Sequence, residues 1–182
     1  MRFRYPRVNG ERCFDGGDRM ELILQPVEEK HIQELAAIYN YYVANTTVTF
    51  HSNKIDMDGM REILFDEDPR FPSYAIFEGN ELCGYCILSH FKKREAYDST
   101  AEVTVYLKPG YERRGIGSFA VRKLEEFAVQ NGFHVLLAVV CEENKGSMAL
   151  FTGLGYKKCA HYREIGIKFG RLLDVVCFQK II

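Results

Sequence analysis

The chain has 182 residues, of which 47% are hydrophobic and 27% are charged, and 24 basic residues oppose 25 acidic ones. This length fits one domain, with a core large enough to fold without metal or disulfide cross-links. The formal net charge of -1 gives no bulk attraction for nucleic acid or an anionic membrane, so neither is predicted as a partner. The apolar runs are far shorter than the ~20 residues of a membrane-spanning helix, and the N-terminus does not resemble a secretory signal. We therefore predict a cytoplasmic protein.

The six cysteines are predicted to be reduced thiols, since no secretory signal directs the chain to an oxidising compartment. Cys83 and Cys86 have the C-x-x-C spacing found in some redox and zinc sites. They lie in a predicted strand, where three residues separate the Cα atoms by ~10 Å, too far for a disulfide. Packing is therefore favoured over redox chemistry for both. The five histidines show no H-x-H or H-E-x-x-H spacing, so no metal site is predicted.

Residues 1–19 are rich in arginine, contain a glycine pair and show no hydrophobic periodicity. They are predicted to be a poorly ordered N-terminal extension, with Met20 as an alternative start. Residues 20–182 contain no linker, repeat or low-complexity run, and are predicted to form a single domain.

Hydrophobic periodicity in this domain predicts helices over residues 28–44 and 56–65, and an amphipathic helix over 113–131. A short helix is predicted over 144–152. The order of elements predicts an α/β (α+β) fold with a mixed, mostly antiparallel central sheet flanked by helices. The predicted strands cover residues 21–24, 73–78, 81–91, 100–107, 135–140, 156–167 and 172–179.

The segment 103–118 (VTVYLKPGYERRGIGS) runs from a strand through a glycine- and arginine-containing loop into a helix. A helix start offers unpaired backbone N–H groups and the positive end of the helix dipole, which together bind anions. Gly115 and Gly117 allow close approach of the backbone, and Arg113 and Arg114 add positive charge. A phosphate or pyrophosphate is the predicted ligand. The alternative is a glycine-capped helix start with solvated arginines.

Two phosphate-binding patterns do not fit this segment. A P-loop needs Gly-Lys-Ser/Thr, whereas Gly117 is followed by Ser118 and Phe119. Residues 115–120 satisfy the dinucleotide pattern G-x-G-x-x-A. That pattern should follow its strand almost immediately, however, and residues 108–114 intervene here.

Residues 111–118 (YERRGIGS) resemble the acetyl-CoA pyrophosphate loop, Q/R-x-x-G-x-G/A, of the GNAT superfamily of N-acetyltransferases. Other segments resemble, in the same order, landmarks of its phosphinothricin and methionine-sulfoximine acetyltransferase branch. The resemblance covers residues 20–182. It implies the GNAT fold, with acetyl-CoA as co-substrate and a homodimer as the assembly. The matching segments are Thr46–Phe50, Lys92–Glu102, Asn144–Ser147, Leu154–Tyr156, and Gly166–Gly170 with Asp174–Val175.

The resemblance implies that Glu102 is the general base that removes a proton from the acceptor amine. Alternation along the predicted strand places Glu102, Thr104 and Tyr106 on one face. The alternative is a glutamate on a solvated face, paired with Lys92 or Arg94.

Phe151 stands where related enzymes carry a tyrosine or histidine that protonates the departing thiolate, and it has no proton to donate. Tyr106, Tyr156 and His161 remain open as substitutes. A thiol pKa of ~8.5 also makes the thiolate a tolerable leaving group without help.

The resemblance further assigns binding roles. Asn144 is expected to hydrogen-bond the pantetheine arm, or to cap the helix that it begins. Arginine suits bidentate capture of a carboxylate or phosphinate, and the alternative is a plain solvated basic loop. The residues expected to contact acetyl-CoA are Val105, Leu107, Arg113, Arg114, Gly115, Gly117, Ser118, Asn144, Ser147 and Phe151. Those expected to line the acceptor pocket are Phe50, Lys92, Arg94 and Tyr97.

The predicted function is direct transfer of acetyl from acetyl-CoA to the primary amine of a small, amino-acid-like acceptor. Two alternatives stay open. In the first, the chain is a non-catalytic acyl-CoA-binding module. In the second, it acetylates a peptide or protein amine.

Overall fold

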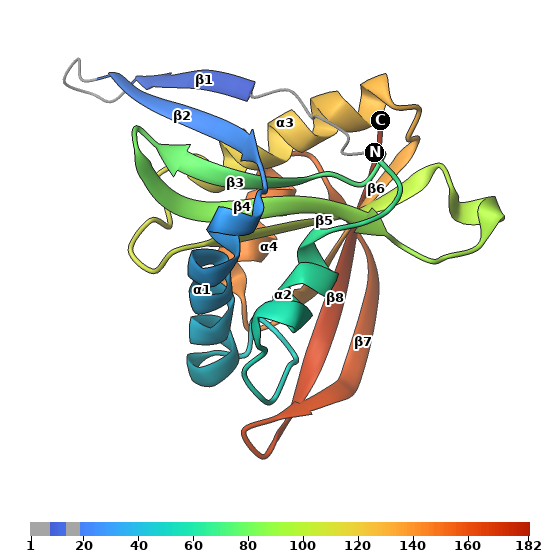
Figure 1. The fold of residues 1–182 in the computed structure, drawn as a ribbon. Coiled ribbons are helices and arrows are strands. Elements are labelled where there is room, and N and C mark those ends of the chain that lie inside the picture. The colour runs from blue at the N-terminus through green and yellow to red at the C-terminus, as the bar shows by residue number, and fades with distance from the viewer. Residues whose placement is uncertain (1–7, 14–18) are drawn as a thin grey trace.

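The computed structural model describes residues 8–13 and 19–182. In these ranges eight strands form one sheet in the order β1-β2-β3-β4-β5-β6-β8-β7 (Figure 1). Neighbouring strands are antiparallel except β5 and β6, which run parallel. This confirms the predicted mixed, mostly antiparallel sheet. The strands are β1 (Val8–Cys13), β2 (Arg19–Pro26), β3 (Ser73–Glu78), β4 (Glu81–His90), β5 (Thr100–Leu107), β6 (Val135–Cys141), β7 (Lys157–Lys168) and β8 (Arg171–Ile181).

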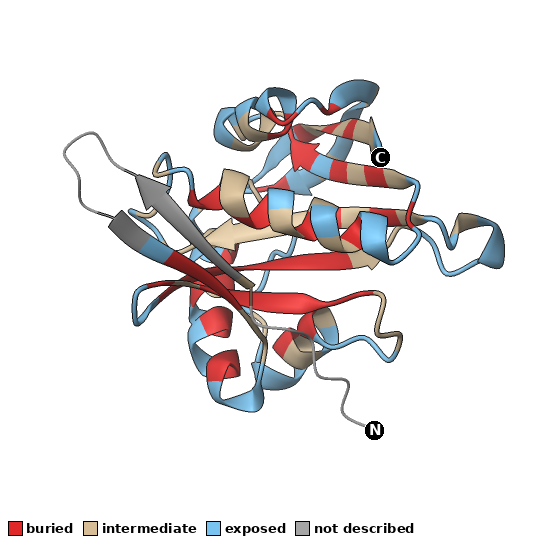
Figure 2. Cartoon of the chain, turned by 90° about the horizontal axis from the view of Figure 1, so that it is seen from above, coloured by how far each residue is buried: buried red, intermediate tan, exposed pale blue. Residues whose placement is uncertain are grey.

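Helices cover both faces of the sheet and create two cores (Figure 1). The apolar stripes of α1 and α2 are buried against one face, and those of α3 and α4 against the other. Figure 2 shows the buried central strands and the exposed outer sides of the helices. No helix in the described ranges has both the length and the apolar character needed to cross a membrane. The helices are α1 (Ile32–Asn45), α2 (Met57–Leu64), α3 (Ile116–Gln130) and α4 (Lys145–Gly153), with 3-10 turns η1 (Glu29–His31) and η2 (Glu95–Tyr97).

The N-terminal extension differs from the prediction over Val8–Cys13. These residues form β1, which pairs with β2 from Val8 opposite Leu24 to Cys13 opposite Arg19. The pairing uses main-chain groups at what would otherwise be an open sheet edge, so it needs no hydrophobic alternation in the added strand. The sequence therefore contained no periodic signal for it. Residues 1–7 and 14–18 lie outside the described part of the chain.

Cys83 and Cys86 both lie in β4, have no exposed surface and belong to the core between the sheet and α3. Both are free thiols, and burial raises the pKa of the Cys83 thiol to about 12. A thiol that stays protonated is a poor nucleophile and a poor metal ligand. This agrees with the packing role predicted from the strand.

The separation of β5 and β6 is the feature of the fold that creates a site. The two strands pair only over Thr100–Glu102 and Val135–Leu137. Beyond Glu102, β5 continues beside β4, while β6 continues beside β8 as far as Cys141. The facing edges of the two strands therefore lack a strand partner along the rest of their length.

Gly84 of β4 allows the backbone of β5 to approach closely at the same place. A Cβ atom at Gly84 would lie 2.3 Å from the carbonyl oxygen of Tyr106 and 3.0 Å from the Cα of Leu107. Both contacts are to backbone, which cannot turn aside as the end of a flexible side chain can. Glycine is thus required here for space.

We expect Gly84→Ala to lower the free energy of unfolding by about 1–3 kcal/mol, because the added methyl group must push β4 and β5 apart. Urea unfolding measures the change. Gly153→Ala is the matched control, since a Cβ at Gly153 meets no atom within 4 Å. Equal stability of the two variants would contradict the close approach of the strands.

Candidate active site

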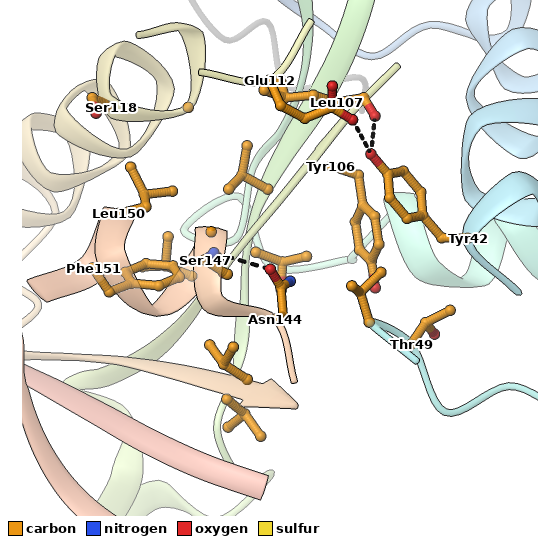
Figure 3. A pocket seen from close by; sticks show the side chains of 18 of the residues that line it. Tyr42, Thr49, Tyr106, Leu107, Glu112, Ser118, Asn144, Ser147, Leu150 and Phe151 are labelled. Atoms are coloured by element: carbon orange, nitrogen blue, oxygen red, sulfur yellow. Dashed lines mark hydrogen bonds between the residues drawn. The ribbon is translucent and has the colours of Figure 1, made fainter. Parts of the chain in front are cut away.

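A cleft of about 630 Å³ lies where β5 and β6 separate. Its walls come from β5, the start of α3, the first turns of α4, the end of β6 and the segment after α1, and Figure 3 shows these side chains gathered around one space. The cleft brings together eleven of the predicted site residues: Phe50, Glu102, Val105, Leu107, Arg113, Gly115, Gly117, Ser118, Asn144, Ser147 and Phe151.

Glu102 lies at the inner end of the cleft, as the last β5 residue that pairs with β6. Its neighbours Thr104 and Tyr106, on the predicted shared face, also line the cleft. Burial raises the pKa of the Glu102 carboxyl above its ordinary value. Among the described residues, no side chain forms a hydrogen bond or an ion pair with this carboxylate, so the alternative pairing with Lys92 or Arg94 is not formed.

The main chain of β5 offers polar groups to the cleft. The N–H of Lys108 donates to the carbonyl of Cys83 on β4, at 2.8 Å. Hydrogen-bonded residues alternate along an antiparallel pair, so the N–H and C=O groups of Val105 and Leu107 point away from β4 and toward the cleft. The Leu107 carbonyl accepts a 2.7 Å hydrogen bond from the Tyr42 hydroxyl, from the side opposite β4.

The loop before α3 is the segment for which an anion site is predicted. Arg113 and Gly115 have φ angles of 58° and 75°, in the left-handed region, with Gly115 as the N-cap of α3. Alternating left- and right-handed residues direct successive N–H groups into a concave nest. The first N–H groups of α3 have no acceptor within the helix and face the same space. Gly117 is buried, and a Cβ there would lie 3.3 Å from Leu150 of α4.

The two arginines of this loop have different roles, which departs from the prediction for Arg114. Arg113 lines the cleft, whereas the guanidinium of Arg114 donates to the Glu78 carboxylate at 2.5 Å and lies 4.8 Å from the centre of the Tyr111 ring. Glu78 is buried, with a side chain only 5% exposed, and a buried carboxylate needs a partner. Arg114 thus ties the loop to the β3–β4 hairpin and, unlike Arg113, does not line the cleft.

Glu112 also holds the loop in place. Its carboxylate accepts a 2.8 Å hydrogen bond from the N–H of Gly110 and a 3.2 Å hydrogen bond from the Tyr42 hydroxyl (Figure 3). The hydroxyl of Tyr42 therefore ties α1 to both the loop and the end of β5. This bonding accounts for an acidic residue beside an anion site.

α4 places Asn144, Ser147 and Phe151 on the opposite wall (Figure 3). The Asn144 side chain accepts a 3.0 Å hydrogen bond from the N–H of Ser147, which confirms that it caps α4. Its amide nitrogen forms no hydrogen bond with a described residue, so it can still donate to a ligand. The Phe151 ring is 3% exposed and packs edge-on against Tyr156.

Of the three substitutes for the missing proton donor, the structure places only Tyr106 at the cleft. Tyr156 is buried behind Phe151. The ring nitrogen Nε2 of His161 lies 2.7 Å from the Asp174 carboxylate on the β7–β8 hairpin. Burial raises the pKa of the Tyr106 hydroxyl, so this group stays protonated across the physiological range.

Three residues predicted for the acceptor pocket lie elsewhere. Lys92, Arg94 and Tyr97 occupy the loop between β4 and β5, which projects beyond the ends of these strands (Figure 1), and none of them lines the cleft. They contact one another instead: the Lys92 ammonium lies 5.9 Å and the Arg94 guanidinium 5.7 Å from the centre of the Tyr97 ring. Such cation–π contacts hold the basic groups on the loop.

Sequence reasoning missed Tyr42, Val48 and Thr49 as cleft residues. Tyr42 belongs to the helical apolar pattern of α1, and nothing in that pattern separates a cleft tyrosine from a core tyrosine. Val48 and Thr49 were visible only as part of the β-branched segment Thr46–Phe50.

The cleft thus lies in a split between parallel strands and joins a glycine- and arginine-containing loop to a carboxylate that has no side-chain partner among the described residues. The model of the acetyltransferase (GNAT) family matches residues 35–156, and the chain belongs to this family.

Two relatives and one solved structure place the chain within the family. A phosphinothricin N-acetyltransferase of Streptomyces coelicolor is 30% identical over 88% of this chain and 96% of its own length. An L-methionine sulfoximine/L-methionine sulfone acetyltransferase of Pseudomonas aeruginosa is 30% identical over 80% of this chain and 86% of its own. The structure of a phosphinothricin acetyltransferase from Sinorhizobium meliloti, in complex with acetyl-CoA, has a TM-score of 0.82 and is 25% identical, covering 87% of each chain.

We expect Arg113→Met and Arg114→Met to have separable effects. Arg113→Met should weaken acetyl-CoA binding about threefold to tenfold and reduce its dependence on salt, because one exposed charge beside the anion nest is lost. Arg114→Met should instead lower the free energy of unfolding by about 1–2 kcal/mol, because buried Glu78 loses its partner.

Titration calorimetry at two salt concentrations and urea unfolding measure these effects. The assignment is contradicted if the salt dependence of acetyl-CoA binding falls in Arg114→Met and stays unchanged in Arg113→Met.

Proposed function

We propose that the chain transfers the acetyl group of acetyl-CoA directly to the primary amine of a small, amino-acid-like acceptor, with Glu102 as the base. The observation that carries this proposal is the position of Glu102. It is half-buried at the inner end of the cleft, has a raised pKa and has no side-chain partner among the described residues.

The cleft fits acetyl-CoA at three places along its length. The nest before α3, with Arg113 beside it, would hold the pyrophosphate. The N–H and C=O groups of Val105, which point toward the cleft, would pair with the amide groups of the pantetheine arm. The amide nitrogen of Asn144 would do the same from the opposite wall. A polar chain of this kind satisfies backbone groups that would otherwise remain unpaired inside the cleft.

Bound acetyl-CoA supplies a thioester carbonyl carbon as the electrophile. Glu102 would accept the proton that the acceptor nitrogen loses as the new N–C bond forms and the C–S bond breaks. A carboxylate with a raised pKa is a stronger base than an ordinary glutamate, which suits it to receive a proton from nitrogen. The proton leaves Glu102 for solvent after the product departs.

The charge that develops on the carbonyl oxygen needs a donor, and a main-chain N–H of β5 that points toward the cleft would provide one. The CoA sulfur departs as a thiolate, since Phe151 offers it no proton. Of the three candidate donors, only Tyr106 lines the cleft. Its protonated hydroxyl would donate a hydrogen bond to the departing sulfur.

The acceptor class rests on the relatives. The two relatives carry the names of acetyltransferases for phosphinothricin and for methionine sulfoximine or sulfone, and these compounds are amino acid analogues. Phe50 lines the cleft, and we assign the acceptor to the part of the cleft beside it. Lys92, Arg94 and Tyr97 lie outside this cleft and are not assigned to the acceptor.

We also propose a homodimer. Its support is the outer face of the β7–β8 hairpin, which exposes Tyr162, Ile165, Ile167 and Leu172 by 48–67% each. Such an apolar patch is typical of a protein interface. Sedimentation at micromolar concentration would show a dimer, and a monomer would contradict the assembly.

We further propose that the protein acts in the cytoplasm. The five cysteines with described side chains are free thiols, which suits a reducing compartment.

The proposed reaction is tested by mass spectrometry of the products formed from acetyl-CoA and a panel of amines. The panel contains amino acids, methionine sulfoximine and sulfone, phosphinothricin, polyamines and short peptides. An acetylated amino-acid-like compound supports the proposal. Product from peptides alone indicates a peptide acetyltransferase, and acetyl-CoA binding with no product indicates a binding module.

We expect Glu102→Gln to lower kcat about a hundredfold or more, because the amide cannot accept the proton, while the affinity for acetyl-CoA stays within about twofold. Steady-state kinetics and calorimetry measure the two quantities. Thr104→Ser, which changes a neighbouring cleft residue without removing an acid or base, is the control. A Glu102→Gln variant with wild-type kcat would rule out Glu102 as the base.

A further inference from the structure

The segment Thr46–Phe50, between α1 and α2, is here named the strap. Its residues Val48, Thr49 and Phe50 line the cleft, although the strap contains neither helix nor strand. A wall without regular secondary structure depends on side-chain contacts for its position. In the described chain, these contacts come from α1 on one side and from β7 and the segment after β6 on the other.

The ring of Phe50 lies directly against the backbone of β7. A Cβ atom at Gly166 would be 2.1 Å from Cε1 and 2.5 Å from Cδ1 of this ring. The φ angle of Gly166 is outside the left-handed region, so glycine is needed there for space and not for backbone conformation. No larger residue fits unless the ring moves, and the cleft lies on the ring's other side.

Lys168 holds the strap from the same face of β7, two residues further along. Its side chain is buried, with 3% exposure, and its Nζ donates to the main-chain carbonyl of Thr49 at 2.7 Å. Burial lowers the pKa of this ammonium. A buried cation is costly unless it is paired, so Lys168 and the Thr49 carbonyl depend on one another.

The opposite side of the strap is fixed through Thr49. Its hydroxyl lies 2.8 Å from the hydroxyl of Tyr39 on α1, which in turn lies 2.7 Å from His51 Nδ1. Near the surface, the Thr47 hydroxyl donates to Glu143 at 2.9 Å. The strap therefore bridges the two halves of the split sheet, from α1 on the β5 side to β7 and the segment after β6 on the other.

We propose that Gly166 and Lys168 are positioning residues that fix Phe50 and thereby set the size of acceptor that the cleft takes. The proposal rests on the proposed function, because it assigns the acceptor to the Phe50 end. The two residues act differently. Gly166 gives the ring room to lie back from the cleft, and Lys168 keeps the strap from moving.

Gly166→Ala should therefore narrow the acceptor end. The KM for the acceptor should rise about tenfold for a large side chain and less for a small one, because misplacement of a wall by a fraction of an ångström is enough to obstruct binding. The KM for acetyl-CoA should stay within about twofold. Lys168→Met should raise the KM for acceptors of every size, since the strap loses its tether.

The controls are Gly153→Ala, in open space, and Lys157→Met, on the exposed part of β7. Both should match the wild type. A double-mutant cycle with Phe50→Leu then tests the path of the effect. In that background the smaller side chain leaves room for a methyl group, so Gly166→Ala should have no further effect on acceptor KM. An equal effect of Gly166→Ala with and without Phe50 would overturn the proposal.

Hydrogen exchange measured by mass spectrometry gives a readout that needs no acceptor. Peptides covering residues 46–50 should exchange faster in Lys168→Met than in Lys157→Met, while peptides from α3 should be unchanged and show that the variant is folded. If the wild type acetylates no amine, the proposed function fails and this readout still tests the positioning. Unchanged exchange of the strap in folded Lys168→Met would overturn it.

Discussion

β5 and β6 are bonded to each other over only three residue pairs, from Thr100 opposite Val135 to Glu102 opposite Leu137. Each strand then follows its other neighbour, and the sheet divides without losing its outer pairings. Because buried main-chain groups need partners, the two facing edges favour a polar ligand chain between them. The position of Glu102, the exposure of the β5 main chain and the location of the cleft all follow from this division.

The surroundings of the division fix two parts of the cleft separately. Beside α3, the buried Glu78 holds Arg114, and the Glu112 carboxylate holds the N–H of Gly110, so the loop is kept in place by contacts within the protein. On another wall, the strap is held between α1 and β7. Prior organisation of this kind lowers the entropic cost of binding two substrates in a reactive arrangement.

Much of the fold was predictable because its signals are local. Alternation in Thr100–Leu107 and the helical pattern after Gly115 gave the correct elements, and the family resemblance named eleven of the residues that line the cleft. The strand Val8–Cys13 was not predicted, because its pairing at the sheet edge uses main-chain groups, which leave no pattern in the sequence. Local signals also do not show where a strand leaves its partner, so the division after Glu102 emerges only from the three-dimensional structure.

The residues that the sequence misplaced are those whose roles depend on distant partners. Arg113 and Arg114 are adjacent and chemically identical, and Glu78, a residue 36 positions away, decides which of them faces the cleft. A contact that was not predicted from the sequence, between Lys168 and Thr49, spans 119 positions. The opposite case is the loop between β4 and β5, where a basic and aromatic cluster was expected to bind the acceptor. There Lys92 and Arg94 contact the ring of Tyr97, a neighbour in sequence.

The central claim is that Glu102, at the point of division, accepts the proton of the acceptor amine. The pH dependence of kcat/KM in the wild type and in Glu102→Gln tests it most directly. The acceptor amine must be neutral, so both rates rise with pH. Only the wild type must also lose a proton from Glu102, whose pKa is raised by burial.

The account predicts that, below this pKa, the wild-type rate changes from first-order to second-order dependence on hydroxide, while the residual rate of Glu102→Gln remains first order throughout. The same first-order dependence in both proteins would contradict the assignment of Glu102 as the base.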